Sequence, residues 1–232
     1  MIAVISDIHG NLAALTAVLA DAKAKGCTNF ISLGDVVSYY CQPNECIDAL
    51  MQCDAINILG NHDSYIVNNE SCPRSKVVSK IIEHHKALIG TNQLNWLKKS
   101  RGFLRQGSTL FVHGGPEDPQ DQYIYKISKD AFPEGVKVLF CGHTHVQVRA
   151  KFGEKIFCNP GSVGQPRDGD ARAAYATLSG GEVALHRVEY DIAKTVSAMQ
   201  HAGYEPFYYE NLYQGAQIGG RVDSIRIVDG DN

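Results

Sequence analysis

The sequence lacks the surplus of basic residues that nucleic-acid and membrane-surface proteins usually have. Its 22 lysines and arginines face 25 aspartates and glutamates, so the formal net charge is −3 at pH 7. Binding to a polyanion or an anionic membrane normally requires a basic patch that shifts this balance. The composition therefore gives no signal for a nucleic-acid or membrane partner.

Long apolar runs and paired cysteines are also missing. No stretch approaches the roughly 20 apolar residues of a transmembrane helix, and residues 1–7 lack the basic segment of a signal peptide. The seven cysteines include no CxxC pair. Thiols without a disulfide framework are typical of a reducing compartment. We therefore expect a cytoplasmic protein with free cysteines.

Hydrophobic periodicity at the start of the chain indicates strands that alternate with helices. The expected strands are 2–6, 30–33 and 55–59, and the expected helices are 12–25 and 43–53. Asn11 is a suitable N-cap for the first helix, and Gly26 is a suitable stop. This order is typical of a layered α/β fold with parallel strands.

The remainder of the chain predicts a second, partly antiparallel sheet packed on the first. A helical pattern over about 73–99 comes first, and a closing helix is expected at 191–203. The apolar runs between them are 110–115, 137–145, 155–162, 173–178 and 183–190. Without repeats or a linker, we expect one domain over 1–214, followed by a loose tail or edge strand over 215–232.

Residues that commonly bind metals recur directly after the apolar runs end. They are Asp7, His9, Asp35, Asn61, His62, Asp63, His113, His143 and His145. Each block alone is more typical of an ordinary turn. Ligands of open α/β sheets bind at the carboxyl ends of strands, however, so five blocks delivered to one edge predict a shared site.

The chemistry of these side chains favours certain metals. Carboxylates, imidazoles and an amide without thiolates suit Mn²⁺, Fe or catalytic Zn²⁺ better than structural zinc. Seven ligands are too many for one ion but suit two ions if one carboxylate bridges them. Two ions about 3.5–4 Å apart stabilise the attacking and leaving oxygens of an in-line displacement. The residues therefore predict phosphoester hydrolysis.

The ordered blocks resemble the signature of the calcineurin-like metallophosphoesterases, which runs D-x-H, GD, GNH[DE], H and GHxH. The chain has DIH, GD, GNHD, VHG and GHTH in that order between residues 7 and 145. The segments GDVVSYYCQPNECIDAL and NPGSVGQPRDGDARAAYATL resemble a bacterial and archaeal branch of small one-domain members. Members of that branch are described as protein phosphatases, phosphodiesterases or dinucleoside tetraphosphatases. The resemblance implies a four-layer α/β/β/α sandwich, in which helices flank two mixed sheets.

The same resemblance implies a role for each residue. Asp7, His9 and His145 would hold the first metal, Asn61, His113 and His143 the second, and Asp35 would bridge them. His62 would contact the phosphate or donate a proton, and Asp63 would orient it. The implied cofactors are two divalent ions, with Mn²⁺ favoured and Fe, Zn²⁺ or Ni²⁺ as alternatives. The implied substrate is a phosphate ester, preferably a phosphodiester or nucleotide.

Three residues near these blocks have two interpretations each. Asn11 either contacts the phosphate or only caps its helix. Arg167 either clamps the phosphate, since guanidinium recognises phosphate in bidentate fashion, or pairs with Asp168 or Asp170. Tyr39 either stacks on an aromatic group of the substrate or packs its loop.

The alternatives to phosphodiester hydrolysis are a phosphomonoesterase, including a protein phosphatase, and a non-catalytic metal-binding module. Phosphoprotein phosphatases of the superfamily have an arginine shortly after the GD block, and this chain has none in GDVVSYYCQP. No expected ligand is missing, which argues against a non-catalytic module. His84, His85, His186 and His201 lie away from the blocks, and we expect them to be structural.

Overall fold

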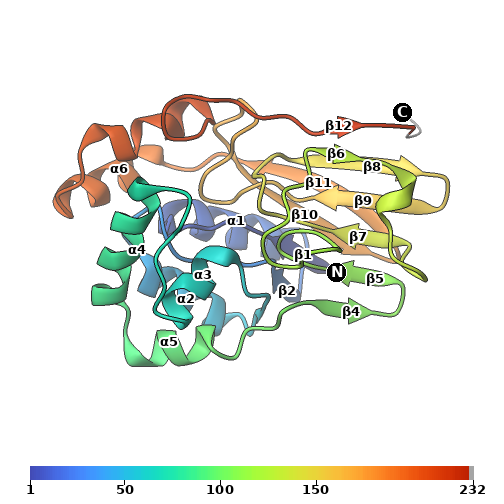
Figure 1. Cartoon of the computed structure of the whole chain (residues 1–232), viewed down its shortest axis with the longest axis horizontal. Coiled ribbons are helices and arrows are strands. Elements are labelled where there is room, and N and C mark those ends of the chain that lie inside the picture. The colour runs from blue at the N-terminus through green and yellow to red at the C-terminus, as the bar shows by residue number, and fades with distance from the viewer. Residues whose placement is uncertain (230–232) are drawn as a thin grey trace.

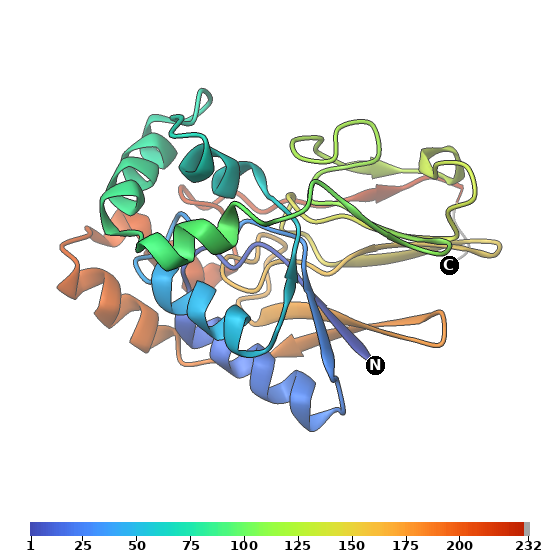
Figure 2. The same ribbon diagram turned by 90° about the horizontal axis from the view of Figure 1, so that it is seen from below.

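Two five-stranded sheets pack face to face in the computed structural model, which describes residues 1–229. The first has the order β11 (Glu182–Val188), β10 (Ala173–Ser179), β1 (Ile2–Ile5), β2 (Asn29–Ser32) and β3 (Ile56–Asn57). β1, β2 and β3 are parallel, as the alternating pattern predicts; β10 is antiparallel to β1, and β11 is antiparallel to β10. Figure 2 shows the two sheets as separate layers.

The second sheet is also mixed. Its order is β4 (Leu104–Gln106), β5 (Thr109–Phe111), β7 (Val138–Phe140), β9 (Lys155–Asn159) and β8 (Val148–Phe152). The three central strands are parallel, and each edge strand is antiparallel to its neighbour. All three central strands therefore end at the same edge, from which the blocks containing His113, His143 and His145 emerge.

The alternation of side chains along β1 shows how the layers are held together. Val4 faces the second sheet and belongs to the core between the sheets, whereas Ala3 and Ile5 face the helices. The rings of Phe111 and Phe140 stack within the inner core, with their centroids 5.0 Å apart. Burial of one such ring contributes about 1.5–3 kcal/mol. The period of two in a strand thus builds both cores at once.

The six α-helices within residues 1–229 gather at one end of the strands (Figure 1), and most of their buried residues join the cluster on the outer side of the first sheet. They are α1 (Leu12–Ala24), α2 (Pro43–Gln52), α3 (Asn61–Val67), α4 (Lys76–Leu88), α5 (Thr91–Leu97) and α6 (Ile192–His201). The Asn11 cap is confirmed, because its Oδ1 accepts a hydrogen bond from the Ala14 backbone N–H at 3.2 Å. The helical pattern over 73–99 forms two helices, because the backbone becomes extended at Ile89 and Gly90. None of the helices within residues 1–229 has the length and apolar character needed to cross a membrane.

The outer face of the second sheet is covered by short elements. These are β6 (Lys126–Ile127), the 3₁₀ helix η1 (Lys129–Ala131) and β12 (Arg226–Ile227), which pack over a third apolar cluster. The predicted sandwich of two mixed sheets is confirmed, although this outer layer is thin. β12 pairs in parallel with β6, so the segment predicted as a tail or edge strand contains an edge strand. Figure 1 shows it running beside β6, and residues 230–232 of that prediction lie outside the described part.

Candidate metal centre

The loops that present the expected ligands turn sharply as soon as their strands end. Five of the seven ligand positions have a left-handed backbone, namely Asp7 (φ 53°), His9 (52°), Asp35 (54°), His143 (65°) and His145 (60°). This conformation is uncommon for residues other than glycine, and it persists only where the surroundings enforce it. Its repetition in three separate loops marks this strand edge as a functional-site candidate.

Two glycines allow the GD and GNHD loops to touch. A Cβ on Gly34 would lie 2.4 Å from the backbone nitrogen of Gly60, and a Cβ on Gly60 would lie 2.1 Å from Oδ1 of Asp35. Both distances are shorter than any tolerable contact, so neither position has room for a side chain. The backbone N–H of His62 donates to the same Oδ1 at 2.9 Å. The close approach therefore places Asp35 at the start of α3.

The first cluster joins His9 and His145. The Nδ1 of His9 donates to the carbonyl of Val37 at 2.9 Å, and that of His145 donates to the carbonyl of Gln165 at 2.7 Å. These bonds assign the protons to Nδ1 and leave a lone pair on each Nε2. The two Nε2 atoms nevertheless face each other at 3.1 Å. Oδ1 of Asp7 lies 3.3 Å from Nε2 of His145.

The second cluster is centred on His113. Its Nδ1 donates to the carbonyl of Leu33 at 3.0 Å, so Nε2 faces the cluster; burial opposes a charge on this ring, but the nearby carboxylate of Asp35 raises its pKa to about 9. That Nε2 lies 3.1 Å from both Oδ1 of Asn61 and Nδ1 of His143, and 3.5 Å from Oδ2 of Asp35. Oδ2 of Asp35 is also 3.8 Å from Nε2 of His9. One carboxylate oxygen thus lies between the two clusters.

The electrostatics of both clusters favour a cation. Burial lowers the pKa of His9 and His145 well below the usual histidine range, so a proton does not occupy the space between them at neutral pH. Oδ1 of Asp7 and Oδ2 of Asp35 are buried without a hydrogen-bond partner. Buried acceptors that face one another are costly unless a positive charge lies between them. The mixed oxygen and nitrogen donors fit divalent ions such as Mn²⁺.

Three groups of side chains lie close enough to hold a metal ion, and one of them joins His62, which was not expected to be a ligand, to His9 and Asp35. Asp7, His9 and His145 form one possible metal-binding group, and Asp35, His113 and His143 form another. Asn61 joins the second group through its contact with His113. The two histidines of GHTH therefore belong to different clusters. Their service as ligands remains a prediction.

His62 lies beside the two clusters. Its Nε2 is 3.8 Å from Oδ2 of Asp35, its Nδ1 has no hydrogen-bond partner, and burial lowers its pKa to about 4. Asp63, which the resemblance implies would orient His62, contacts the backbone of the GD loop instead. Oδ1 of Asp63 accepts from the backbone N–H groups of Val36 and Val37 at 2.9 and 3.2 Å. Asp63 therefore braces the backbone of the GD loop and does not hydrogen-bond to Nδ1 of the imidazole.

The predicted ion pair between Arg167 and Asp168 or Asp170 is wrong. Asp168 pairs with Arg187, and Asp170 forms an ion pair of 2.6 Å with Arg172. Arg187 lies on β11, opposite Ala174 of β10, where it reaches the loop that precedes β10. The strand register thus gives Asp168 a partner, Arg187, that sequence proximity did not indicate, whereas Asp170 pairs with its sequence neighbour Arg172.

Arg167 itself is buried beside the first cluster. Its guanidinium donates to Oε1 of Gln165 at 3.0 and 2.7 Å and to the hydroxyl of Tyr39 at 3.1 Å, and it lies over the Tyr39 ring. No carboxylate within residues 1–229 forms an ion pair with it. A buried, positively charged fork without a counter-ion suits a phosphate group.

The side chain of Asn11 is fully used by the scaffold. Its Oδ1 accepts from Ala14 N–H and from the hydroxyl of Thr195 at 2.7 Å. Its Nδ2 donates to the carbonyl of Gly164 at 2.9 Å and to the hydroxyl of Tyr190 at 3.2 Å. The capping role is therefore the one that this geometry supports, and no free group remains for a phosphate.

Sequence reasoning missed three residues around His143. Its Nε2 lies 3.4 Å from Oδ1 of Asp121, whose carboxylate accepts two hydrogen bonds of 2.8 and 2.6 Å from Arg74. Burial opposes the charge of Asp121, but His143 and Arg74 hold its pKa at about 2. The ring of Tyr123 packs on His143 with centroids 3.8 Å apart. All three residues come from irregular segments without periodicity, so the sequence offered no signal.

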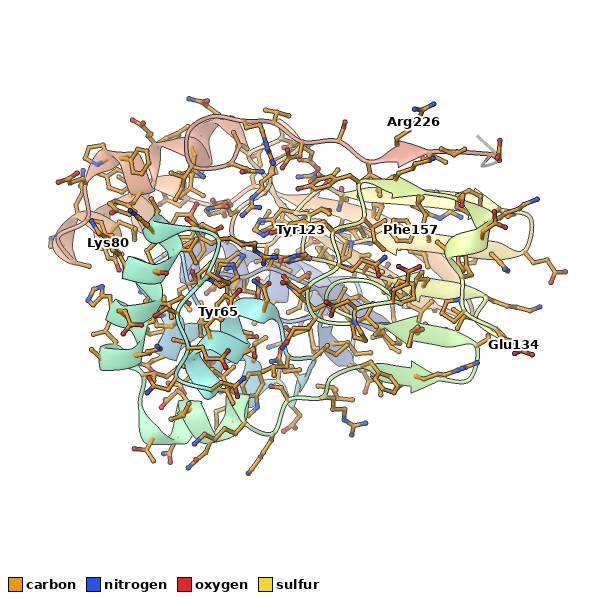
Figure 3. All side chains as sticks on the ribbon, in the orientation of Figure 1. Tyr65, Lys80, Tyr123, Glu134, Phe157 and Arg226 are labelled. Carbon is orange, nitrogen blue, oxygen red and sulfur yellow. The ribbon has the colours of Figure 1, made fainter. Side chains whose placement is uncertain are left out.

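An open cleft of about 400 Å³ lies beside the two clusters. We call it the aromatic cleft, and its principal lining residues are Tyr39, Tyr123, Tyr125, Arg167, Phe207 and Arg221. Figure 3 labels Tyr123 near the centre of the molecule, between the helices and the second sheet. The cleft therefore opens where the elements that supply the clusters converge.

Comparison with known proteins agrees with this geometry. Residues 1–181 match the calcineurin-like phosphoesterase superfamily domain. An uncharacterized protein from Methanocaldococcus jannaschii is 33% identical over 239 residues, which cover 93% of this chain and 98% of that protein. A metallophosphoesterase from Sphaerobacter thermophilus is similar in structure, with a TM-score of 0.81, 32% identity and coverage of 92% and 99%.

A hypothetical protein from Pyrococcus horikoshii OT3 shares the fold at 20% identity. Its TM-score is 0.80, and the match covers 94% of this chain and 100% of that one. Together with the domain match over most of the chain, these similarities show that the protein belongs to the calcineurin-like phosphoesterase superfamily, a metal-dependent family.

Proposed function

We propose that this protein is a dinuclear metal-dependent phosphoesterase that prefers phosphodiester or nucleotide substrates. The observation that carries the proposal is the pair of buried clusters in which imidazole nitrogens and carboxylate oxygens converge, with Oδ2 of Asp35 between them. Two divalent ions held there, with Mn²⁺ favoured, would polarise the phosphoryl group and activate the attacking water. The seven side chains of the two clusters would hold them.

Arg167 would bind the phosphate oxygens in this mechanism. Its guanidinium is fixed by Gln165 and Tyr39, so it loses little side-chain freedom when the substrate arrives. A preorganised guanidinium stabilises negative charge more effectively than one that must first be ordered. Its neighbours therefore support a role in orienting the phosphate.

His62 would donate a proton to the leaving oxygen. Its imidazole is neutral at pH 7, because burial lowers its pKa to about 4. A phosphate anion bound beside the ring would raise that pKa, since a nearby negative charge favours the imidazolium form. Protonation would thus accompany substrate binding. Asp63 would contribute by holding the GD loop against α3.

Metal binding and hydrolysis together test the proposal. We expect about two divalent ions per chain, activity that chelation removes and Mn²⁺ restores, and faster cleavage of bis(p-nitrophenyl) phosphate than of p-nitrophenyl phosphate. Asp35→Asn should lower occupancy at both positions, because it removes the charge shared by the two clusters. His145→Asn should deplete mainly one position.

Two results would contradict the dinuclear proposal. One is a single tightly bound ion in a fully active protein, and the other is an Asp35→Asn variant with the metal content of the wild type. A clear preference for the monoester would instead identify a phosphomonoesterase and overturn the proposed substrate class.

A further inference from the structure

The aromatic cleft is continuous with the candidate metal centre. The ring of Tyr39 meets that of His9 edge to face with centroids 4.6 Å apart, and the ring of Tyr123 lies against that of His143. Gln165, which also lines the cleft, accepts the hydrogen bond from Nδ1 of His145. A phosphate bound at the clusters would therefore carry its substituent directly into the cleft.

The lining combines flat apolar surfaces with positive charge. Tyr39, Tyr123, Tyr125 and Phe207 contribute aromatic rings. Arg167 and Arg221 contribute guanidinium groups; that of Arg221 is paired with Asp223 at 2.9 Å, so Arg167 supplies the charge without a carboxylate partner. None of the described residues that line the cleft is an aspartate or glutamate. Such a surface suits a ligand that is both planar and anionic, because aromatic rings stack on π systems and guanidinium groups attract phosphate.

The tyrosines are arranged as a stacking surface. The rings of Tyr123 and Tyr125 are parallel within 4°, with their centroids 5.7 Å apart. Arg74 lies 5.5 Å above the Tyr123 ring and limits its movement. Phe207, in the 3₁₀ helix η2 (Pro206–Tyr208), is partly exposed at 46%. Rigid, accessible rings are typical of sites that stack nucleic-acid bases.

The wall opposite α4 is supplied by the segment that leads to β12. Gln217, Ile218 and Arg221 of this segment line the cleft. The backbone N–H of Asp223 donates to the carbonyl of Arg167 at 2.7 Å, and β12 anchors the end of the segment on β6. This wall lies beyond residues 1–181, which match the superfamily domain. The cleft therefore combines a shared phosphate site with a wall from outside the matched region.

We propose that the aromatic cleft is a binding site for one nucleoside monophosphate unit, with its base against Tyr123, Tyr125 and Phe207. Its phosphate would lie toward Arg167 and the clusters. This inference rests on the proposed function and specifies the group that the phosphoester substrate carries. The volume of about 400 Å³ is in the lower part of the range of small-molecule pockets and suits one nucleotide. Ser75 and Gln217 also line the cleft. The hydroxyl of Ser75 already accepts from Val78 N–H and Nε2 of Gln217 already donates to Asp223, which leaves the hydroxyl as a donor and Oε1 of Gln217 as an acceptor for a heterocycle.

Equilibrium binding tests this assignment without relying on turnover. Adenosine 5′-monophosphate, ribose 5-phosphate and phenyl phosphate would each be titrated calorimetrically into protein loaded with Mn²⁺. We expect adenosine monophosphate to bind about tenfold more tightly than either of the others, as one stacked base contributes about this much. The comparison with ribose 5-phosphate isolates the base, because the phosphate and sugar are the same.

Variants then locate the base. Tyr125→Ala should reduce the preference for adenosine monophosphate over ribose 5-phosphate to about twofold or less. Phe207→Ala should reduce it in the same direction. Tyr213→Ala is the matched control, because this exposed tyrosine lies outside the cleft lining and its loss should leave the preference intact.

Three outcomes would overturn the assignment. Equal affinity for adenosine monophosphate and ribose 5-phosphate would show that the cleft does not bind the base. Equal affinity for adenosine monophosphate and phenyl phosphate would show that it accepts any aromatic ring. A preference that survives Tyr125→Ala and Phe207→Ala would place the base elsewhere. In these cases the hydrolysis of bis(p-nitrophenyl) phosphate would persist, whereas a protein that binds no phosphate ester and hydrolyses none would contradict the proposed function as well.

Discussion

The metal-centre clusters and the aromatic cleft adjoin each other but are built in different ways. The cluster residues follow directly after regular strands, and each imidazole of His9, His113 and His145 is fixed by a backbone carbonyl. The cleft walls come mostly from irregular segments, namely the loop around residue 123, η2 and the segment before β12, together with the start of α4. Under the proposed function, the sheet edges would fix the chemistry, and the irregular connections, which vary more freely, would determine what is bound.

The largest expected effect comes from His62→Asn, which alters the chemistry and leaves the clusters intact. Loss of a general acid should slow turnover about 10²–10⁴-fold for a poor leaving group. The loss should shrink for nitrophenolate, which departs with little protonation. The measurement compares the hydrolysis rates of the variant and the wild type over substrates whose leaving groups differ in pKa, and it includes the metal content of both proteins.

Two outcomes would remove His62 from the acid role. One is an equal loss for every leaving group, as expected if the ring only braces its loop, and the other is loss of a metal ion. His201→Asn, on the exposed face of α6, is the matched control and should behave as the wild type.

Asp121→Asn tests the boundary between the two regions, because Asp121 reaches from the cleft loop to a cluster histidine. A carboxylate that holds a metal-bound histidine typically contributes about 10–100-fold to metal affinity or activity. We expect a loss of this size at one of the two positions in a competition titration with a chromophoric chelator. Asp130→Asn changes an exposed aspartate of η1 and serves as the control. Unchanged affinity at both positions would show that Asp121 does not support His143.

The smallest effect concerns stability and the scaffold behind both regions. Nδ1 of His85, on α4, accepts a hydrogen bond from the backbone N–H of Ser38 at 3.0 Å, and burial lowers its pKa to about 3. The unfolded chain binds this proton near the ordinary value of 6.5. Because the unfolded state takes up the proton first, the contribution of His85 to stability is lost as the pH falls below that value. Between about pH 7 and pH 5 the loss is about 2 kcal/mol.

His85→Asn keeps an acceptor for Ser38 and removes the titration. Denaturant unfolding at both pH values should therefore show a smaller pH dependence in the variant than in the wild type, at constant metal concentration. An identical pH dependence would mean that His85 does not contribute to it.

The fold and the clusters were predictable because their signals are local. An expected ligand such as Asp7 or His113 comes directly after a strand, so one short sequence pattern predicts both the strand and the ligand position. Of the two interpretations of Arg167, the ion pair failed because the register of β10 and β11 brings Arg187 to Asp168. Asp121 and Arg74 are 47 positions apart in sequence and lie in two irregular segments. Neither segment has a sequence pattern that predicts contact with the other. Contacts of this kind arise only when the loops pack.

The opposed ring nitrogens of His9 and His145 have a consequence for the folding equilibrium. The folded chain presents a receptor for positive charge that the unfolded chain does not reproduce, because the two rings are 136 positions apart in sequence. An ion that binds only the folded state raises the free energy of unfolding by about 1.4 kcal/mol for each tenfold rise in its free concentration above the dissociation constant. The free concentration of divalent ions would then set the fraction of chains that are folded, independently of any substrate.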